Sequence, residues 1–246
     1  MKTSKELKNS PQELKNSLGF ITGHDPSLSK MFNDWGFDTT NNIKFLDDAD
    51  FILFSDDKAS VTPFLYGHKR SSKCGPCNFR LDMRENKIFR SCVDDLPKFG
   101  IGRGALFLNV MNGGTLYQSI NNHDSKPHIV RLFYDEKLEQ VKGYKNIFGP
   151  SNHTQGMIPS KVTQALILGK ASVSSERWVE NNKIEGGNHA GSYLDNEIIY
   201  YYDTNSLCFQ PQVNTLTSES HPCRLYFKGL FKNIMQATYK TNLTVN

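Results

Sequence analysis

One segment of the chain combines small residues and a sharp turn in a way that serves nucleophilic chemistry. It runs from Phe99 to Asn109 and reads Phe-Gly-Ile-Gly-Arg-Gly-Ala-Leu-Phe-Leu-Asn. A strand that enters a glycine-flanked turn and continues as a helix has the geometry of a nucleophile elbow, which holds one side chain clear of the sheet. Backbone N–H groups at the start of the helix would stabilise an oxyanion. The nucleophile position is Gly102, so the segment predicts the frame of a catalytic site without its nucleophile.

A second pattern with chemical potential is Cys74-Gly-Pro-Cys77. This spacing occurs in thioredoxin-type redox sites and also supplies half of a zinc site. Here it follows a polar loop over residues 67–73 rather than a strand, and no second such motif is present in the sequence. We therefore favour a free or reducible thiol pair, with a structural zinc ion held by Cys74, Cys77 and distant ligands as the alternative. No other metal or cofactor is expected.

Two histidines need an interpretation beside these motifs. His153 is expected to be a hydrogen-bonded structural residue, with a pocket or ligand role as the alternative. His221 precedes Pro222 and Cys223, and we interpret this segment as a loop that leads into the last helix.

The elements that must position these groups alternate in type along the first half of the chain, which indicates parallel βαβ units. Strands are expected over residues 18–22, 51–54 and 99–101, and helices over 27–35 and about 79–95. After Gly113 and Gly114, turn signals separate short β-rich runs. These runs cover residues 128–134, 140–141, 170–173, 177–179, 197–202 and 207–210, and a final amphipathic helix covers about 223–236.

Composition excludes several classes of protein. The chain has 246 residues, 37% of them hydrophobic, a mean hydropathy of −0.52 and a net charge of +4. These values are typical of one soluble globular domain, and no apolar run approaches the length of a membrane span. A charge this small, spread along the chain, does not indicate nucleic-acid binding. Residues 1–17 form a polar N-terminal tail without the apolar core of a secretory signal, so we expect a cytoplasmic protein whose five cysteines are thiols.

The elbow and its surroundings resemble the class I glutamine amidotransferases, in particular the branch similar to gamma-glutamyl hydrolases. That branch has Gly-Ile-Cys-Arg-Gly-Ala-Gln at the elbow and Gly-Gly-X-Leu-X-Gln after it, which residues 100–106 and 113–118 follow except at the Cys and the first Gln. Further segments agree in order over residues 51–54, 61–67, 151–155 and 206–211. The resemblance implies a flavodoxin-like α/β domain over residues 18–246, with a central mainly parallel sheet flanked by helices and additional β-hairpins in the C-terminal half. It also suggests a bacteriophage origin.

The sequence departs from the family pattern where the chemistry would take place. Carried over position by position, the catalytic Cys becomes Gly102, the His becomes Gln212 and the Glu becomes Asn214. The elbow Gln becomes Leu106, and the two oxyanion-hole glycines fall among residues 55–58. A glycine forms no thioester, and an amide does not titrate near neutral pH. The resemblance therefore implies a pseudoenzyme, with no catalytic residues at the triad positions.

Three interpretations of function follow. We favour a binding or regulatory factor, for instance a phage factor that engages a host or phage protein. The alternatives are a small-molecule binder, in which the missing Cys side chain leaves space for an anion at the helix N-terminus, and a residual or rewired hydrolase or amidotransferase. The candidate pocket residues are Ser55, Asp56, Asp57, Arg103, Leu106, Gln118, His153 and Gln155. The sequence leaves the partner and the oligomeric state open.

Overall fold

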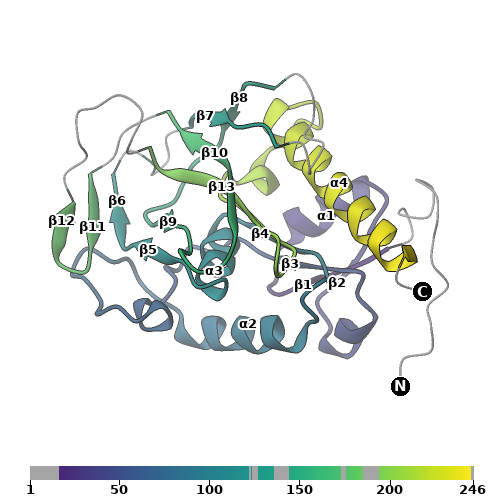
Figure 1. The fold of residues 1–246 in the computed structure, drawn as a ribbon, viewed down its shortest axis with the longest axis horizontal. Coiled ribbons are helices and arrows are strands. Elements are labelled where there is room, and N and C mark those ends of the chain that lie inside the picture. Colours follow the sequence, from purple (N-terminus) through teal and green to yellow (C-terminus); the bar gives the residue numbers. More distant parts are fainter. Residues whose placement is uncertain are drawn as a thin grey trace.

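Five parallel strands form the half of the sheet that carries the elbow. The computed structural model describes residues 17–121, 123, 127–135, 144–172, 176–184 and 194–244. The parallel strands are β1 (Leu18–Ile21), β2 (Asp38–Thr40), β3 (Phe51–Phe54), β4 (Lys98–Ile101) and β14 (Ser206–Phe209). They lie in the order β2-β1-β3-β4-β14 (Figure 1). This is the strand order of flavodoxin-like sheets, in which ligands bind beyond the carboxyl ends of the strands.

The rest of the sheet is antiparallel and comes from the C-terminal half of the chain. It continues from β14 through β13 (Asn196–Tyr201), β10 (Ala165–Ala171), β7 (His128–Leu132) and β8 (Asn146–Gly149). The short strands β5 (Thr115–Tyr117) and β9 (Gly156–Ile158) pair with each other, and β9 also pairs with β13. A small sheet of β12 (Asn182–Ile184), β11 (Arg177–Val179) and β6 (Ser119–Ile120) lies at one end of the molecule. The expected fold class, with its C-terminal hairpins, is confirmed.

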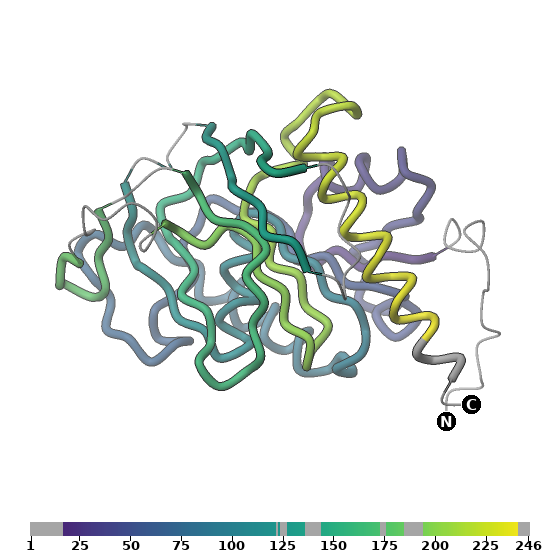
Figure 2. Tube along the Cα trace, turned by 45° about the horizontal axis from the view of Figure 1, so that its top comes forward, coloured from purple at the N-terminus to yellow at the C-terminus, as the bar shows by residue number. Residues whose placement is uncertain are grey.

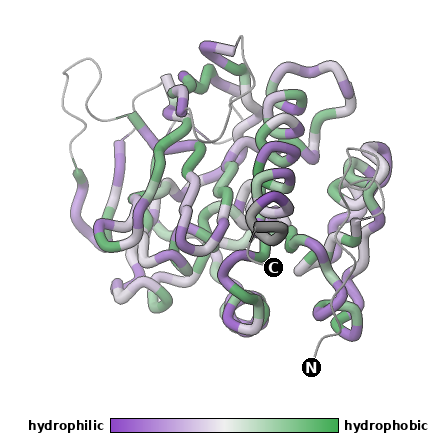
Figure 3. The backbone as a smooth tube through the Cα atoms, turned by 45° about the vertical axis from the view of Figure 1, so that its right-hand side comes forward, coloured by the Kyte–Doolittle hydropathy of each residue, from purple (hydrophilic) through white to green (hydrophobic). Residues whose placement is uncertain are grey.

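Helices cover both faces of the sheet. One face carries α1 (Pro26–Asp34) and α4 (Pro222–Thr244), which lie side by side in Figures 1 and 2. The other face carries α2 (Phe79–Ser91) and α3 (Arg103–Met111). Short 3₁₀ helices cover Ile43–Asp48 (η2), Pro63–Tyr66 (η3) and Val213–Thr215 (η4). In Figure 3, α4 shows both hydrophobic and hydrophilic residues, as expected for a helix that packs on a sheet with one side exposed.

Each face of the sheet has its own hydrophobic core. Phe32 of α1 and Phe231 of α4 pack on Phe51 and Phe99 of the sheet, and the ring centroids of Phe99 and Phe231 lie 4.7 Å apart. On the other face, Phe107 of α3 stacks on Phe54 with centroids 5.5 Å apart. Successive residues of β3 therefore point to opposite cores, as the alternation of a strand requires.

The observed elements differ from the expected ones at some of their ends. The second helix ends at Ser91 rather than near residue 95. The residues after it form a turn around the buried ammonium group of Lys98. Lys98 Nζ donates to the carbonyl oxygens of Val93, Asp94 and Leu96 at 2.9, 3.2 and 2.9 Å. The last helix runs beyond residue 236 to Thr244, and β10 begins at Ala165 rather than 170. The strand expected over 140–141 lies outside the described residues.

The beginning of the chain contributes one contact to the described structure. Residues 1–16 of the expected tail lie outside the described residues. Ser17 is buried, and its hydroxyl lies 3.1 Å from Tyr239 Oη on α4. Among the helices of the described part of the chain, none has the length and apolar character that a membrane crossing requires.

Candidate functional site

The strand, turn and helix around Gly102 have the predicted geometry. Gly102 caps α3 with φ 55° and ψ −119°, and its N–H donates to the Phe209 carbonyl of β14 at 3.1 Å. A Cβ on Gly100 would lie 2.4 Å from the Gly104 carbonyl oxygen, and one on Gly104 would lie 2.0 Å from that of Phe54. Both flanking positions therefore require glycine, because the helix starts in direct contact with the sheet backbone.

The place of a nucleophile side chain is taken by a carboxylate from a neighbouring loop. A Cβ on Gly102 would lie 2.1 Å from Oδ1 of Asp56, which follows β3. That oxygen accepts a hydrogen bond from the Arg103 backbone N–H at 2.8 Å, and Asp56 Oδ2 accepts one from Gln212 Nε2 at 3.1 Å. Burial raises the pKa of Asp56 above its ordinary 3.8, against the effect of these hydrogen bonds. Asp56 thus fills the nucleophile position and occupies an N–H group at the helix start.

The side chains expected at the other two triad positions, Gln212 and Asn214, donate to separate acceptors. The Gln212 amide, besides its bond to Asp56, donates to the Asn152 carbonyl oxygen at 3.3 Å. Asn214 Nδ2 donates to Asp25 Oδ2 at 3.0 Å. Neither amide can accept a proton near neutral pH, so Gln212 and Asn214 do not form a base and its orienting partner.

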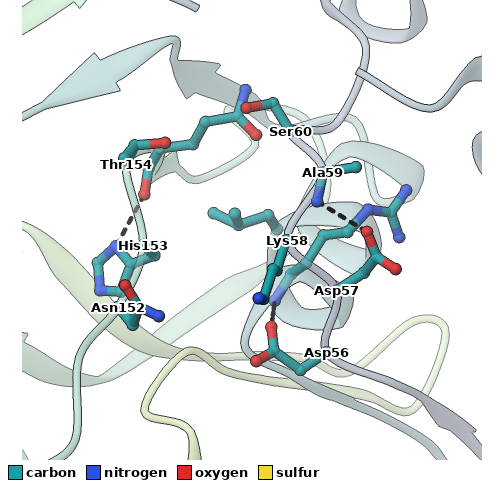
Figure 4. Close-up of a pocket in the computed structure, with 11 residues that line it drawn as sticks. Asp56, Asp57, Lys58, Ala59, Ser60, Asn152, His153 and Thr154 are labelled. Carbon is teal, nitrogen blue, oxygen red and sulfur yellow. Dashed lines mark hydrogen bonds between the residues drawn. The ribbon is translucent and has the colours of Figure 1, made fainter. Parts of the chain in front are cut away.

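A cavity of about 310 Å³ opens beside this elbow. In Figure 4, Asp56 and Asp57 lie on one wall, with His153 and Thr154 on the opposite wall. Its lining residues are Asp56, Asp57, Lys58, Ala59, Ser60, Arg103, Leu106, Asn152, His153, Thr154 and Gln155. The cavity therefore joins the loop after β3, the start of α3 and the loop before β9.

Six of the eight predicted pocket residues line this cavity, namely Asp56, Asp57, Arg103, Leu106, His153 and Gln155. The other two, Ser55 and Gln118, do not. Ser55 is buried beside Gly23, where a Cβ added to Gly23 would lie only 2.4 Å from Ser55 Oγ. Gln118 accepts from the Ser71 N–H at 2.6 Å and donates to the Lys69 carbonyl oxygen at 2.8 Å. Its role in this geometry is to hold the loop that precedes Cys74.

Two of the lining residues are held by contacts with other parts of the protein. Arg103 is 2% exposed and forms ion pairs with Asp82 and Glu85 of α2, and Thr22 Oγ1 donates to Glu85 at 2.8 Å. Gln155 Oε1 accepts from the Val61 N–H at 2.8 Å. These side chains shape the cavity, and the Arg103 charge is already neutralised by its two partners.

Cys74 and Cys77 form a close pair of free thiols. Their Sγ atoms lie 3.8 Å apart. Burial raises the pKa of Cys74 to about 11, with a further contribution from Cys77. Within the described residues, no third histidine, cysteine or carboxylate joins the pair as a metal site would need. A thiol with such a pKa is protonated at neutral pH. The free-thiol interpretation stays a prediction.

Sequence reasoning missed one group of polar residues. His123, His128 and Glu197 are buried together beside His153. The available signal was the recurrence of histidine at positions 123, 128 and 153, but Glu197 is far away in the sequence. Only the pairing of β13 with β9 and β10 brings it to these histidines.

The fold and the elbow together are similar to those of class I glutamine amidotransferases. The sequence profile of the family described as Peptidase C26 matches residues 36–175, more than half of the chain. The chain therefore belongs to the Peptidase C26 family.

Individual proteins are similar to this chain in part of the sequence or in the fold. A glutamine amidotransferase-like protein, YvdE, of Lactococcus lactis is 34% identical over 91 residues, which cover 36% of this chain and 38% of that protein. The match thus spans well under half of the relative. A GMP synthase subunit protein of Thermoplasma acidophilum has a similar fold, with a TM-score of 0.61 and 12% identity over 94% of this chain and 97% of that one. A glutamine amidotransferase of Thermotoga maritima gives a TM-score of 0.56 and 12% identity, covering 92% and 98% of the two chains.

Proposed function

We propose that this protein is a catalytically inactive member of its family that acts by binding. The observation that carries the proposal is the position of the Asp56 carboxylate, 2.1 Å from where a Cβ on Gly102 would lie. A carbonyl substrate would need that space and the Arg103 N–H that Asp56 already occupies. Without a nucleophile, a base and a free N–H donor, the elbow lacks the groups that acyl transfer from an amide requires.

We expect the purified protein to release no ammonia from glutamine, and no glutamate from gamma-glutamyl compounds, above the rate in buffer. Loss of a whole triad removes most of the rate enhancement of such enzymes. The measurement is a coupled glutamate dehydrogenase assay at high protein concentration. Turnover that is lost in Asp56→Asn but kept in the matched neighbour variant Asp57→Asn would contradict the proposal and would favour a rewired hydrolase that uses Asp56.

The proposed role is that of a regulatory factor with a protein partner, in the cytoplasm of the cell that makes it. The resemblance of residues 100–106 and 113–118 to the gamma-glutamyl hydrolase branch supports placing the chain near that branch, and a phage origin is part of the same proposal. Exposed aromatic side chains support a partner surface. Phe64 is 73% and Phe79 48% exposed, with ring centroids 6.5 Å apart.

The cavity favours a second candidate function, the binding of a small cationic molecule. The anion expected at the start of α3 does not fit, because the Asp56 carboxylate already accepts the Arg103 N–H there. Asp56 and the exposed Asp57 instead present carboxylates to the cavity, with Lys58 beside them. An aliphatic amine would pair with Asp56 and offset the cost of its burial.

A linear polyamine is therefore expected to raise the melting temperature, and glutamate is not. At about one hundred times Kd, a ligand that binds only the folded state stabilises it by about 2.7 kcal/mol. The measurement is a thermal-shift titration at constant ionic strength, with Asp56→Asn as the variant that should lose the shift. An equal shift in wild type and variant, or none at millimolar polyamine, would rule out this candidate.

A further inference from the structure

Four titratable side chains meet inside the antiparallel half of the fold, behind the His153 wall of the cavity. His123 follows β6, His128 begins β7, His153 precedes β9 and Glu197 lies in β13. Their exposed fractions are 0%, 6%, 6% and 1%. Burying a carboxylate among imidazoles costs free energy unless charge or coordination compensates it, so this cluster calls for a physical explanation.

The three imidazoles converge on one oxygen atom. The Nε2 atoms of His123, His128 and His153 lie 3.4, 3.5 and 3.4 Å from Glu197 Oε1. These separations are longer than the usual range of N–H···O hydrogen bonds. Two ligands at about 2.0–2.1 Å from a tetrahedral metal ion are about 3.4 Å apart. The distances from each imidazole Nε2 to Glu197 Oε1 are thus those expected between two ligands of the same metal ion.

His123, His128 and Glu197 form one compact set of candidate ligands. Their ligand atoms all lie within 4.8 Å of one another. His123 Nδ1 lies 3.0 Å from the Asn121 carbonyl oxygen, to which it can donate only as N–H. That hydrogen bond directs the lone pair of Nε2 toward Glu197, which is the arrangement of metal-binding histidines.

The surroundings supply an outer layer of contacts. Asp195 accepts from Arg177 Nε at 2.6 Å, and its other carboxylate oxygen lies 3.7 Å from His123 Nε2. Ser151 Oγ donates to the His123 carbonyl oxygen at 2.6 Å. His153 Nδ1 lies 3.0 Å from the Gln155 carbonyl oxygen, an acceptor, and 2.7 Å from Gln210 Nε2, a donor. These neighbours therefore do not determine which ring nitrogen of His153 carries the proton. We therefore treat His153 as a neighbour of the set.

We propose that His123, His128 and Glu197 bind a divalent transition-metal ion of the zinc type through two imidazole nitrogens and a carboxylate oxygen. Imidazole ligands favour such ions over Mg²⁺ or Ca²⁺. The bound ion would offset the buried carboxylate and would tie the segment before β7 to β13. This site is separate from the elbow, so its presence or absence does not bear on the proposed loss of catalysis.

The test uses full-length protein without an affinity tag, stripped with a chelator, incubated with Zn²⁺ and desalted. Elemental analysis is expected to find about one zinc ion per chain, and the ion should raise the melting temperature because it binds only the folded site. His128→Gln and Glu197→Gln should each abolish retention of zinc. The exposed His24→Gln is the matched control, and Cys74→Ser with Cys77→Ser tests the thiol pair; both should keep the ion.

Cobalt spectroscopy tests the ligands without any substitution that could impair folding. With Co²⁺ in the wild-type protein, we expect visible d–d absorption of a low-coordinate nitrogen and oxygen site and no thiolate-to-cobalt charge-transfer band. A thiolate band, or loss of zinc in the Cys74 and Cys77 double variant with retention in His128→Gln, would overturn the proposal. So would wild-type protein that holds no zinc after desalting and shows no thermal shift.

Discussion

Replacing Arg103 by Met is expected to lower the free energy of unfolding by about 3–5 kcal/mol, the usual cost of removing one partner from a buried ion pair. The guanidinium is 2% exposed and pairs with Asp82 and Glu85, which are 0% and 1% exposed. Without it, two carboxylates remain in a dry environment with no positive charge. Chemical denaturation at pH 7, followed by circular dichroism, measures the loss.

Two further variants show whether the unpaired charge is the cause. Arg84→Met changes an exposed arginine on the same helix, α2, and should alter stability by less than about 0.5 kcal/mol. The triple variant of Arg103→Met, Asp82→Asn and Glu85→Gln removes the whole charge network and should recover most of the loss. If the triple variant is as unstable as the single one, packing rather than charge explains the role of Arg103.

The Arg103→Met variant should also lose stability as the pH rises from acid toward neutrality. Burial raises the folded-state pKa of Glu85 above its ordinary 4.5, and Arg103 opposes that rise. Without Arg103 the pKa rises further, so between 4.5 and this raised value the folded protein keeps a proton that the unfolded chain has released. Stability falls with increasing pH in that window. Because the wild-type pKa of Glu85 is itself raised, the difference from wild type should grow only between the wild-type and variant pKa values, and it should be constant above the higher one.

Four of the five parallel strands could be predicted from the sequence because they are apolar runs, whereas the edge strand Asp38–Thr40 is polar and was not predicted. Phe51–Phe54 is buried at every position, which is typical of a strand covered on both faces. Strands such as Ser119–Ile120 and Asn182–Ile184 were not predicted. They are too short to show a period of two, and their pairing partners are distant in the sequence.

The candidate site could be predicted only where the family pattern places a residue. Gly102, Gln212 and Asn214 follow from the elbow and its downstream segment, and Asp56 follows from the loop after β3. The expectation of open space at Gly102 was wrong, because the Asp56 carboxylate fills that space. The order of residues in the sequence does not show that a side chain from another loop reaches Gly102. The same limit applies to Glu197, which only the antiparallel strands bring to the histidines.

Restoring a cysteine at position 102 should give a reactive thiol only when Asp56 is removed as well. In Gly102→Cys, the new Cβ meets the Asp56 carboxylate, and the nearby negative charge raises the pKa of the thiol. In Gly102→Cys with Asp56→Gly, the thiol lies at the N-terminus of α3, beside the released Arg103 N–H, which favours the thiolate. Alkylation of the introduced thiol by iodoacetamide at pH 7 is expected to be at least about tenfold faster in the double variant, which corresponds to about one unit of pKa.

The rate is measured by mass spectrometry of the peptide that contains position 102, which separates it from the five native thiols. Gly102→Cys with Asp56→Asn is the matched control, because it keeps the bulk of the side chain and removes its charge. An intermediate rate there assigns part of the inhibition to charge and part to the occupied space. Equal rates in all three variants would show that Asp56 does not block the nucleophile position. None of the three should release ammonia from glutamine, since Gln212 cannot accept the proton that acyl transfer requires.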